Sequence, residues 1–90
     1  MTMDLQELRK KIDEIDESLI DLFQKRMDLS AEVARYKKQH DLPVYDPVRE
    51  REILDKLSAK VKESRGPSIA ALYSLLFDLS RAEQEKIIAL

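Results

Sequence analysis

Apolar residues recur at intervals of three and four along the first forty residues of the chain. This spacing is typical of one buried face of a helix. No Gly or Pro interrupts the segment, so we expect a helix over about residues 4–39, on the order of 50 Å long. A compact domain of 90 residues is only about 25–30 Å across, so this helix must protrude or pair with another chain. The stripe comprises Leu5, Leu8, Ile12, Ile15, Leu19, Leu22, Leu29, Val33 and Tyr36.

Two further helices are predicted downstream, because the single Gly and the three Pro residues fall at only two places. Asp46-Pro47 is a typical helix start and predicts a helix over about 47–63. Residues 64–68 then break the chain, and a third helix is expected over about 68–89. No alternating run predicts a strand, so the predicted fold class is all-α, with three helices in a single domain over 1–90. A chain this short has a thin core by itself, which favours an intertwined homodimeric helical bundle.

The stripe of the first helix contains one basic residue, Arg26, between Leu22 and Leu29. A guanidinium stays charged at any ordinary pH, and its burial in an apolar face is costly unless an anion meets it. That anion is either a carboxylate of the protein or a ligand. Arg26 alone is equally compatible with a polar residue that sets the register of a coiled coil.

Polar residues also interrupt or flank the apolar faces of the other predicted helices. In the first helix, Arg26 and Lys37 share a face about 16 Å apart along the axis. In the second helix Glu50 interrupts the apolar stripe. In the third helix the neutral residues Ser80 and Gln84 do so. The candidate site residues are Arg9, Arg26, Lys37, Asp46, Arg49, Glu50, Ser80 and Gln84.

Arg9 cannot reach this group within one chain, because it lies 17 residues from Arg26, on the order of 25 Å. If the long helices of an antiparallel two-fold dimer cross near residue 20, Arg9 comes level with residues around 30 of the partner. Two equivalent cationic pockets per dimer are therefore expected. Each of these charged residues, taken alone, could lie on a solvent-exposed helix face. Because polar residues fall on inward-facing positions of all three helices, a shared anionic ligand is favoured.

Composition narrows the classes of partner. The chain has 16 basic and 18 acidic residues and a net charge of -2, which gives no support for binding nucleic acid. It has no Cys and one His, so we expect no disulfide, no metal site and no cofactor. No apolar run approaches the ~20 residues that span a membrane, and no secretory signal is visible, so we expect a cytoplasmic protein.

The motifs together resemble those of the all-helical class of chorismate mutases. The resemblance covers nearly the whole chain, from Leu5 to about Ile88, and is specific only as a joint pattern. The motifs are Leu8-Arg9-x-x-Ile12-x-x-Ile15-Asp16, Lys25-Arg26, Val33-x-x-x-Lys37, Asp46-x-x-Arg49-Glu50-Arg51-Glu52 and Ser80-x-x-x-Gln84.

The resemblance implies an intertwined dimer of three-helix chains and a role for each matching residue. Arg9 of the opposite chain and Arg26 would hold the two substrate carboxylates, and Ser80 would also contact a carboxylate. Lys37 and Gln84 would donate to the ether oxygen, and Lys37 would also reach a carboxylate. Arg49 would lie near the substrate, while Glu50 and the backbone of Asp46 would bind the ring hydroxyl.

The implied function is the rearrangement of chorismate to prephenate in phenylalanine and tyrosine biosynthesis, by conformational restriction and electrostatic stabilisation of the ether oxygen. No nucleophile and no obligatory proton transfer are needed. Two alternatives stay open: an isochorismate-pyruvate lyase with a similar cationic pocket, and a non-catalytic helical dimerisation module. Whether the chain stands alone or is one domain of a larger shikimate-pathway enzyme also stays open.

Overall fold

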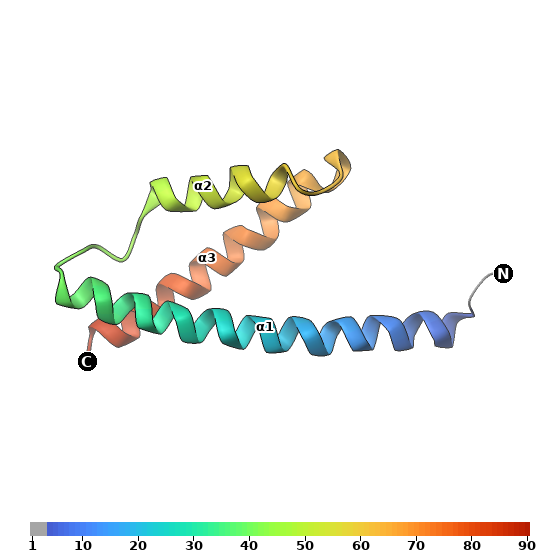
Figure 1. Cartoon of the computed structure of the whole chain (residues 1–90), viewed down its shortest axis with the longest axis horizontal. Helices are drawn as coiled ribbons and strands as arrows, with labels where there is room; N and C mark the ends of the chain where they lie inside the picture. Colours follow the sequence, from blue (N-terminus) through green and yellow to red (C-terminus); the bar gives the residue numbers. More distant parts are fainter. Residues whose placement is uncertain (1–3) are drawn as a thin grey trace.

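The chain folds into three α-helices in a computed structural model that describes residues 4–90 (Figure 1). They are α1 (Leu5–Gln39), α2 (Pro47–Ser58) and α3 (Gly66–Ile88), and the short 3-10 turn η1 (Glu63–Arg65) precedes α3. The described residues contain no strand, which confirms the all-α prediction. No helix among residues 4–90 has the length and apolar character needed to cross a membrane.

Both ends of α1 are closed by local hydrogen bonds. At the N-terminus the Asp4 side chain accepts a bond from the Glu7 amide at 2.8 Å. At the C-terminus Asp41 adopts a left-handed conformation, with φ of 53°, and the Leu42 amide donates to the Lys37 carbonyl at 2.9 Å. This reversal holds the last turn of α1, which carries Lys37, and directs the chain toward α2.

The second and third helices have boundaries that differ from those expected. Helix α2 ends at Ser58, five residues before the expected position 63, because the last turn tightens and the Lys60 amide bonds the Leu57 carbonyl at 3.0 Å. Helix α3 begins at Gly66, two residues before the expected position 68. Pro67 lies within its first turn, where the missing amide hydrogen has no helical partner to lose.

The C-terminal half of α1 packs on α3 through small residues. Ser30, Ala31 and Ala34 are buried, as is Phe77 on α3, and small side chains let two helices approach closely. Residues Leu29, Val33 and Tyr36, which the periodicity assigned to the buried face, remain 60%, 45% and 58% exposed in the chain. The packed face is therefore rotated by one residue, about 100°, from the apolar stripe.

The N-terminal half of α1 extends away from α2 and α3 (Figure 1). Every residue from 4 to 22 is exposed, including the whole apolar stripe from Leu5 to Leu22. The radius of gyration is 16.7 Å, against about 12 Å for a compact chain of this length. The helix thus protrudes as its length requires, and the rest of residues 4–90 leaves its apolar stripe uncovered.

Candidate functional site

A cavity of about 380 Å³ lies between the C-terminal half of α1, the start of α2 and the C-terminal half of α3. That volume is in the lower part of the range for small-molecule sites. Apolar side chains from all three helices, including Val33, Ile53 and Phe77, form part of the wall. Seven of the eight candidate residues line it: Arg26, Lys37, Asp46, Arg49, Glu50, Ser80 and Gln84.

The eighth candidate, Arg9, does not line this cavity. It lies on the exposed N-terminal half of α1, far along the helix from Arg26. Within a single chain the structure therefore brings together every candidate except the one that was expected to come from a partner.

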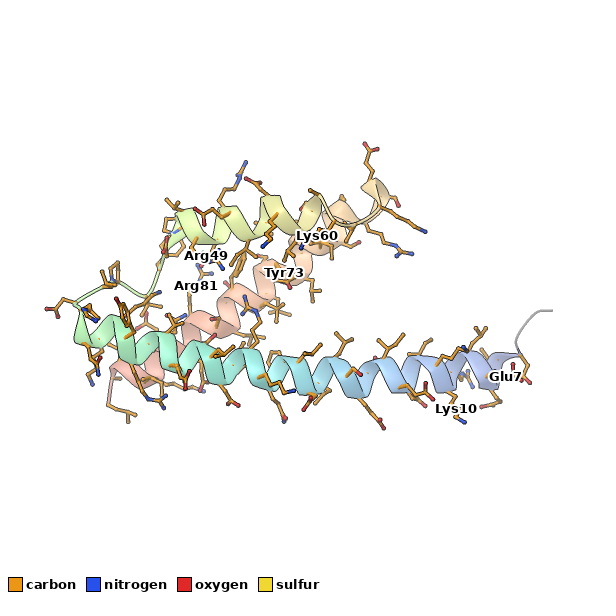
Figure 2. The ribbon with its side chains drawn as sticks, in the orientation of Figure 1. Glu7, Lys10, Arg49, Lys60, Tyr73 and Arg81 are labelled. Atoms are coloured by element: carbon orange, nitrogen blue, oxygen red, sulfur yellow. The ribbon has the colours of Figure 1, made fainter. Side chains whose placement is uncertain are left out.

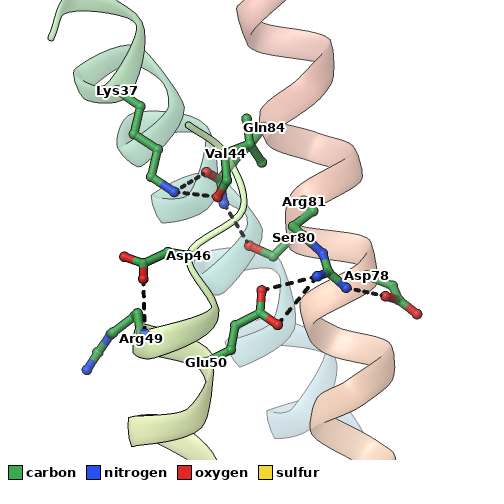
Figure 3. A network of polar contacts seen from close by, with 9 residues as sticks. All are labelled: Lys37, Val44, Asp46, Arg49, Glu50, Asp78, Ser80, Arg81 and Gln84. Atoms are coloured by element: carbon green, nitrogen blue, oxygen red, sulfur yellow. Dashed lines mark hydrogen bonds and ion pairs between the residues drawn. The ribbon is translucent and has the colours of Figure 1, made fainter. Parts of the chain in front are cut away.

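Lys37 joins α1 to the connector before α2 and to α3 (Figure 3). Its Nζ donates to the Val44 carbonyl at 2.7 Å and to Gln84 Oε1 at 3.1 Å. An ammonium group has three N–H donors, so one remains for a ligand. Because Lys37 can only donate, its bond also fixes which end of the Gln84 amide faces it.

A row of hydroxyl groups continues from the Gln84 amide into the helix interface (Figure 3 shows its first step). Gln84 Nε2 donates to Ser80 Oγ at 3.3 Å, and Ser80 Oγ lies 2.7 Å from Ser30 Oγ. Ser30 Oγ donates its single proton to the Arg26 carbonyl at 3.0 Å, so Ser80 must donate to Ser30. The Gln84 amide is thus held from both ends and retains one N–H.

Arg26 is half-buried and has no ion pair with any carboxylate in residues 4–90. Its guanidinium lies 5.8 Å from the centre of the Tyr73 ring, in a cation–π contact. Figure 2 shows Tyr73 on the part of α3 that lies, in this view, between α2 and α1. The Tyr73 face supports the charge but leaves the guanidinium donors without an anion.

Glu50 is held by an arginine that the sequence interpretation did not include. Arg81 Nη1 lies 3.4 Å from each Glu50 carboxylate oxygen, and Arg81 Nη2 also pairs with Asp78 (Figure 3). The guanidinium lies 5.1 Å from the centre of the Tyr45 ring. Arg81 could have been found from its position, since it stands four residues after Phe77 on the face that carries Gln84.

Asp46 and Arg49 form the first turn of α2 at the cavity edge. The Asp46 side chain caps the helix by accepting from the Arg49 amide at 3.1 Å. The Asp46 carbonyl accepts from the Glu50 amide at 3.1 Å, so only its second lone pair remains for a ligand. The backbone of Asp46 is therefore less free than expected. The Arg49 side chain makes an exposed pair with Glu52, at 3.7 Å.

Ser30 is the other polar lining residue that the sequence interpretation missed, and it is 7% exposed. It lies one turn after Arg26 on α1, beside the apolar stripe rather than on it. The lining residues together carry four positive charges (Arg26, Lys37, Arg49, Arg81) and two negative ones (Asp46, Glu50), a net charge of +2. A small dianion would neutralise that charge.

The chain is similar in sequence to several known proteins. Chorismate mutase from Methanocaldococcus jannaschii is 44% identical over 59 residues, which is 66% of this chain and 60% of that protein. T-protein from Haemophilus influenzae is 42% identical over 67 residues, 74% of this chain and 17% of that protein. The 4-amino-4-deoxychorismate mutase from Streptomyces venezuelae is 41% identical over 46 residues, 51% of this chain and 45% of that protein.

The matched segment spans less than two thirds of the length of each of these relatives. A model of the family described as chorismate mutase type II matches residues 8–85. That match runs from the exposed half of α1 to the end of the cavity wall on α3, so this chain belongs to the chorismate mutase type II family.

Proposed function

We propose that this protein converts chorismate to prephenate by an intramolecular rearrangement in aromatic amino acid biosynthesis. The observation that carries the proposal is the net charge of +2 on the lining of a small cavity, which complements a dicarboxylate. Arg26 in particular faces no protein carboxylate in residues 4–90. A ligand carboxylate would meet that unpaired guanidinium. The cytoplasm as its location remains a prediction from the sequence.

The reaction breaks one C–O bond while one C–C bond forms, so the protein has two tasks. It must hold a flexible dianion in its compact, chair-like conformer, an orientation effect of several kcal/mol. It must also stabilise the negative charge that builds on the ether oxygen. Lys37 and Gln84 suit that task, because each keeps one N–H donor in the structure.

The other lining residues take positions around the same ligand in this proposal. Arg26 binds one carboxylate of the dianion, and Arg49 lies near the substrate at the start of α2. Ser80 contacts a carboxylate when its proton turns from Ser30 Oγ to the ligand. Glu50 accepts a hydrogen bond from the ring hydroxyl. The second lone pair of the Asp46 carbonyl is available to accept from the same hydroxyl. These roles follow the family resemblance and the positions of the residues in the cavity wall.

We further propose that the active protein is a two-fold homodimer in which Arg9 completes the site of the opposite chain. The uncovered stripe from Leu5 to Leu22 supports an interface on the N-terminal half of α1. Arg9 lies in that same half and is exposed. Two carboxylates on the substrate then meet two arginines, one from each chain.

The decisive experiment is the decay of chorismate absorbance with purified protein and identification of the product. Prephenate supports the proposal. Salicylate and pyruvate from isochorismate, with no prephenate from chorismate, would identify the lyase alternative instead.

Thermal-shift measurement with a bicyclic dicarboxylate that mimics the transition state tests the non-catalytic alternative. Stabilisation by the mimic is expected for an enzyme, since the ligand binds only the folded state. A purely structural dimer would show no shift with the mimic and no turnover.

A further inference from the structure

Arg81 lies in the cavity wall beside Glu50. In the proposed function, Glu50 accepts a hydrogen bond from the ring hydroxyl of the substrate. The Arg81 side chain is held on three sides, by Glu50, by Asp78 and by the face of Tyr45. The Glu50 and Arg81 side chains are only 21% and 30% exposed. Their mutual attraction is therefore screened less than that of a surface pair.

We propose that Arg81 sets the substrate specificity of this pocket by neutralising Glu50, so that a ring hydroxyl is accepted and a ring ammonium is disfavoured. The inference rests on the proposed function, because it assumes that Glu50 faces the ring substituent. It concerns the choice between chorismate and its analogue in which an amino group replaces the 4-hydroxyl. One relative of this chain is named a 4-amino-4-deoxychorismate mutase, so both chemistries occur among related proteins.

The physical reason is the charge that each substituent brings. A hydroxyl is neutral and needs only an acceptor oxygen, which Glu50 offers while Arg81 holds the same carboxylate. A primary amine is protonated at neutral pH and would add a second cation next to the guanidinium. A bare carboxylate would attract that ammonium, but a carboxylate already paired with Arg81 attracts it far less, and the guanidinium repels it.

Substitution of Asp78 should change the substrate preference in the opposite direction to substitution of Arg81. The Asp78 carboxylate lies on the outer side of Arg81, is 64% exposed and does not line the cavity. It partly offsets the positive charge that Arg81 presents to the pocket. Removal of Asp78 should therefore strengthen the discrimination that removal of Arg81 weakens.

The experiment measures kcat/KM for chorismate and for 4-amino-4-deoxychorismate with the purified protein and takes the ratio of the two values. Arg81→Met should lower the preference for chorismate by roughly tenfold or more, whereas Arg81→Lys, which keeps the charge, should restore most of it. Asp78→Asn should raise the preference by about twofold, since the Asp78 carboxylate is largely exposed. Arg51→Met is the matched control, because Arg51 makes a similar pair with Asp55 on the exposed face of α2.

The outcomes separate the two proposals. If the wild-type protein turns over neither compound, the proposed function and the role of Arg81 are both wrong. If it makes prephenate but Arg81→Met lowers both kcat/KM values equally, Arg81 supports the structure or binds a substrate carboxylate, and the specificity role alone is wrong. Should Arg81→Met fail to fold by circular dichroism, Asp78→Asn decides: an unchanged or lowered preference contradicts the inference.

Discussion

At the scale of single residues, hydrogen bonds within the chain hold several polar groups of the cavity in place. Lys37 and Gln84 bond each other and retain one donor each, and Ser80 and Ser30 hold the amide from behind. Donors fixed in this way need no reorganisation when charge develops on a substrate oxygen. Arg26 is the exception, since it lies over the Tyr73 ring and pairs with no carboxylate in residues 4–90.

Lys37→Ala and Arg26→Ala should each lower kcat/KM by roughly 100-fold or more, because each removes a charged contact to the substrate. Lys25→Ala is the matched control, since Lys25 makes only an exposed pair with Asp21 on the same helix. Steady-state kinetics of the three variants, with size-exclusion chromatography to verify assembly, provides the measurement. Near-normal activity of Arg26→Ala would remove the main argument for dianion binding.

Ser30→Ala tests whether the hydroxyl row positions Gln84. The variant removes the acceptor of the Ser80 proton, so we expect kcat to fall about tenfold with little change in KM and about 1 kcal/mol of stability to be lost. Ser18→Ala is the control, because Ser18 makes the same type of bond to a carbonyl one turn earlier on an exposed part of α1. Equal kcat values for the two variants would show that Ser30 serves packing alone.

At the scale of the elements, α1 has two halves with different partners. The C-terminal half packs on α3 through Ser30, Ala31 and Ala34, while the N-terminal half carries an apolar stripe that no other part of residues 4–90 covers. Exposed stripes of this length mark interaction surfaces in soluble proteins. Helix α1 is therefore the element that both builds the cavity and presents the expected dimer interface.

Ile15→Lys combined with Leu19→Lys should disrupt that interface. Both residues are exposed in the single chain, at 60% and 56%, so the change costs little within one chain but places four charges in a two-fold interface. Light scattering after size exclusion should show loss of the dimer, and activity should fall with it. Asp13→Lys, off the stripe on the same helix, should leave the dimer intact. A double variant that still forms dimers would place the interface elsewhere.

At the scale of the whole molecule, the single chain exposes more surface than a folded monomer of its size. Its accessible surface is 7458 Å² for a mass of 10.5 kDa, whereas about 5,400 Å² is typical of a monomer of that mass. The excess matches what a stable subunit interface buries. We therefore expect the folded unit to be an assembly of two chains, with stability that depends on protein concentration.

Mixed dimers test the contribution of Arg9 across that assembly. Chains with Arg9→Ala and chains with Lys37→Ala should each be nearly inactive, but after unfolding and refolding together they should regain about a quarter of wild-type activity. Half of randomly paired dimers are mixed, and one of the two sites in each mixed dimer has neither substitution. The mixture of Arg9→Ala with Arg9→Ala/Lys37→Ala chains is the control and should regain nothing. No recovery in the first mixture would rule out a site shared between chains.

Periodicity determined much of this protein from its sequence. The 3.6-residue repeat predicts three helices, and it identifies polar residues such as Arg26, Glu50 and Gln84 on inward faces, because it fixes the angular position of each side chain around its own helix. The resemblance in motif spacing added the expected ligand. These inferences concern residues within one helix or residues matched one by one to a family pattern.

Only the tertiary structure decided how the helices meet. Periodicity assigned Leu29 and Val33 to the buried face of α1, yet Ala31 and Ala34 pack on α3, because the closest approach of two helices depends on their crossing and on small side chains at that point. Glu50 and Arg81 are 31 residues apart in sequence, and their pairing likewise exists only after α2 and α3 have packed. Contacts between helices depend on the relative placement of the helices, and the periodicity of one helix carries no information about that placement.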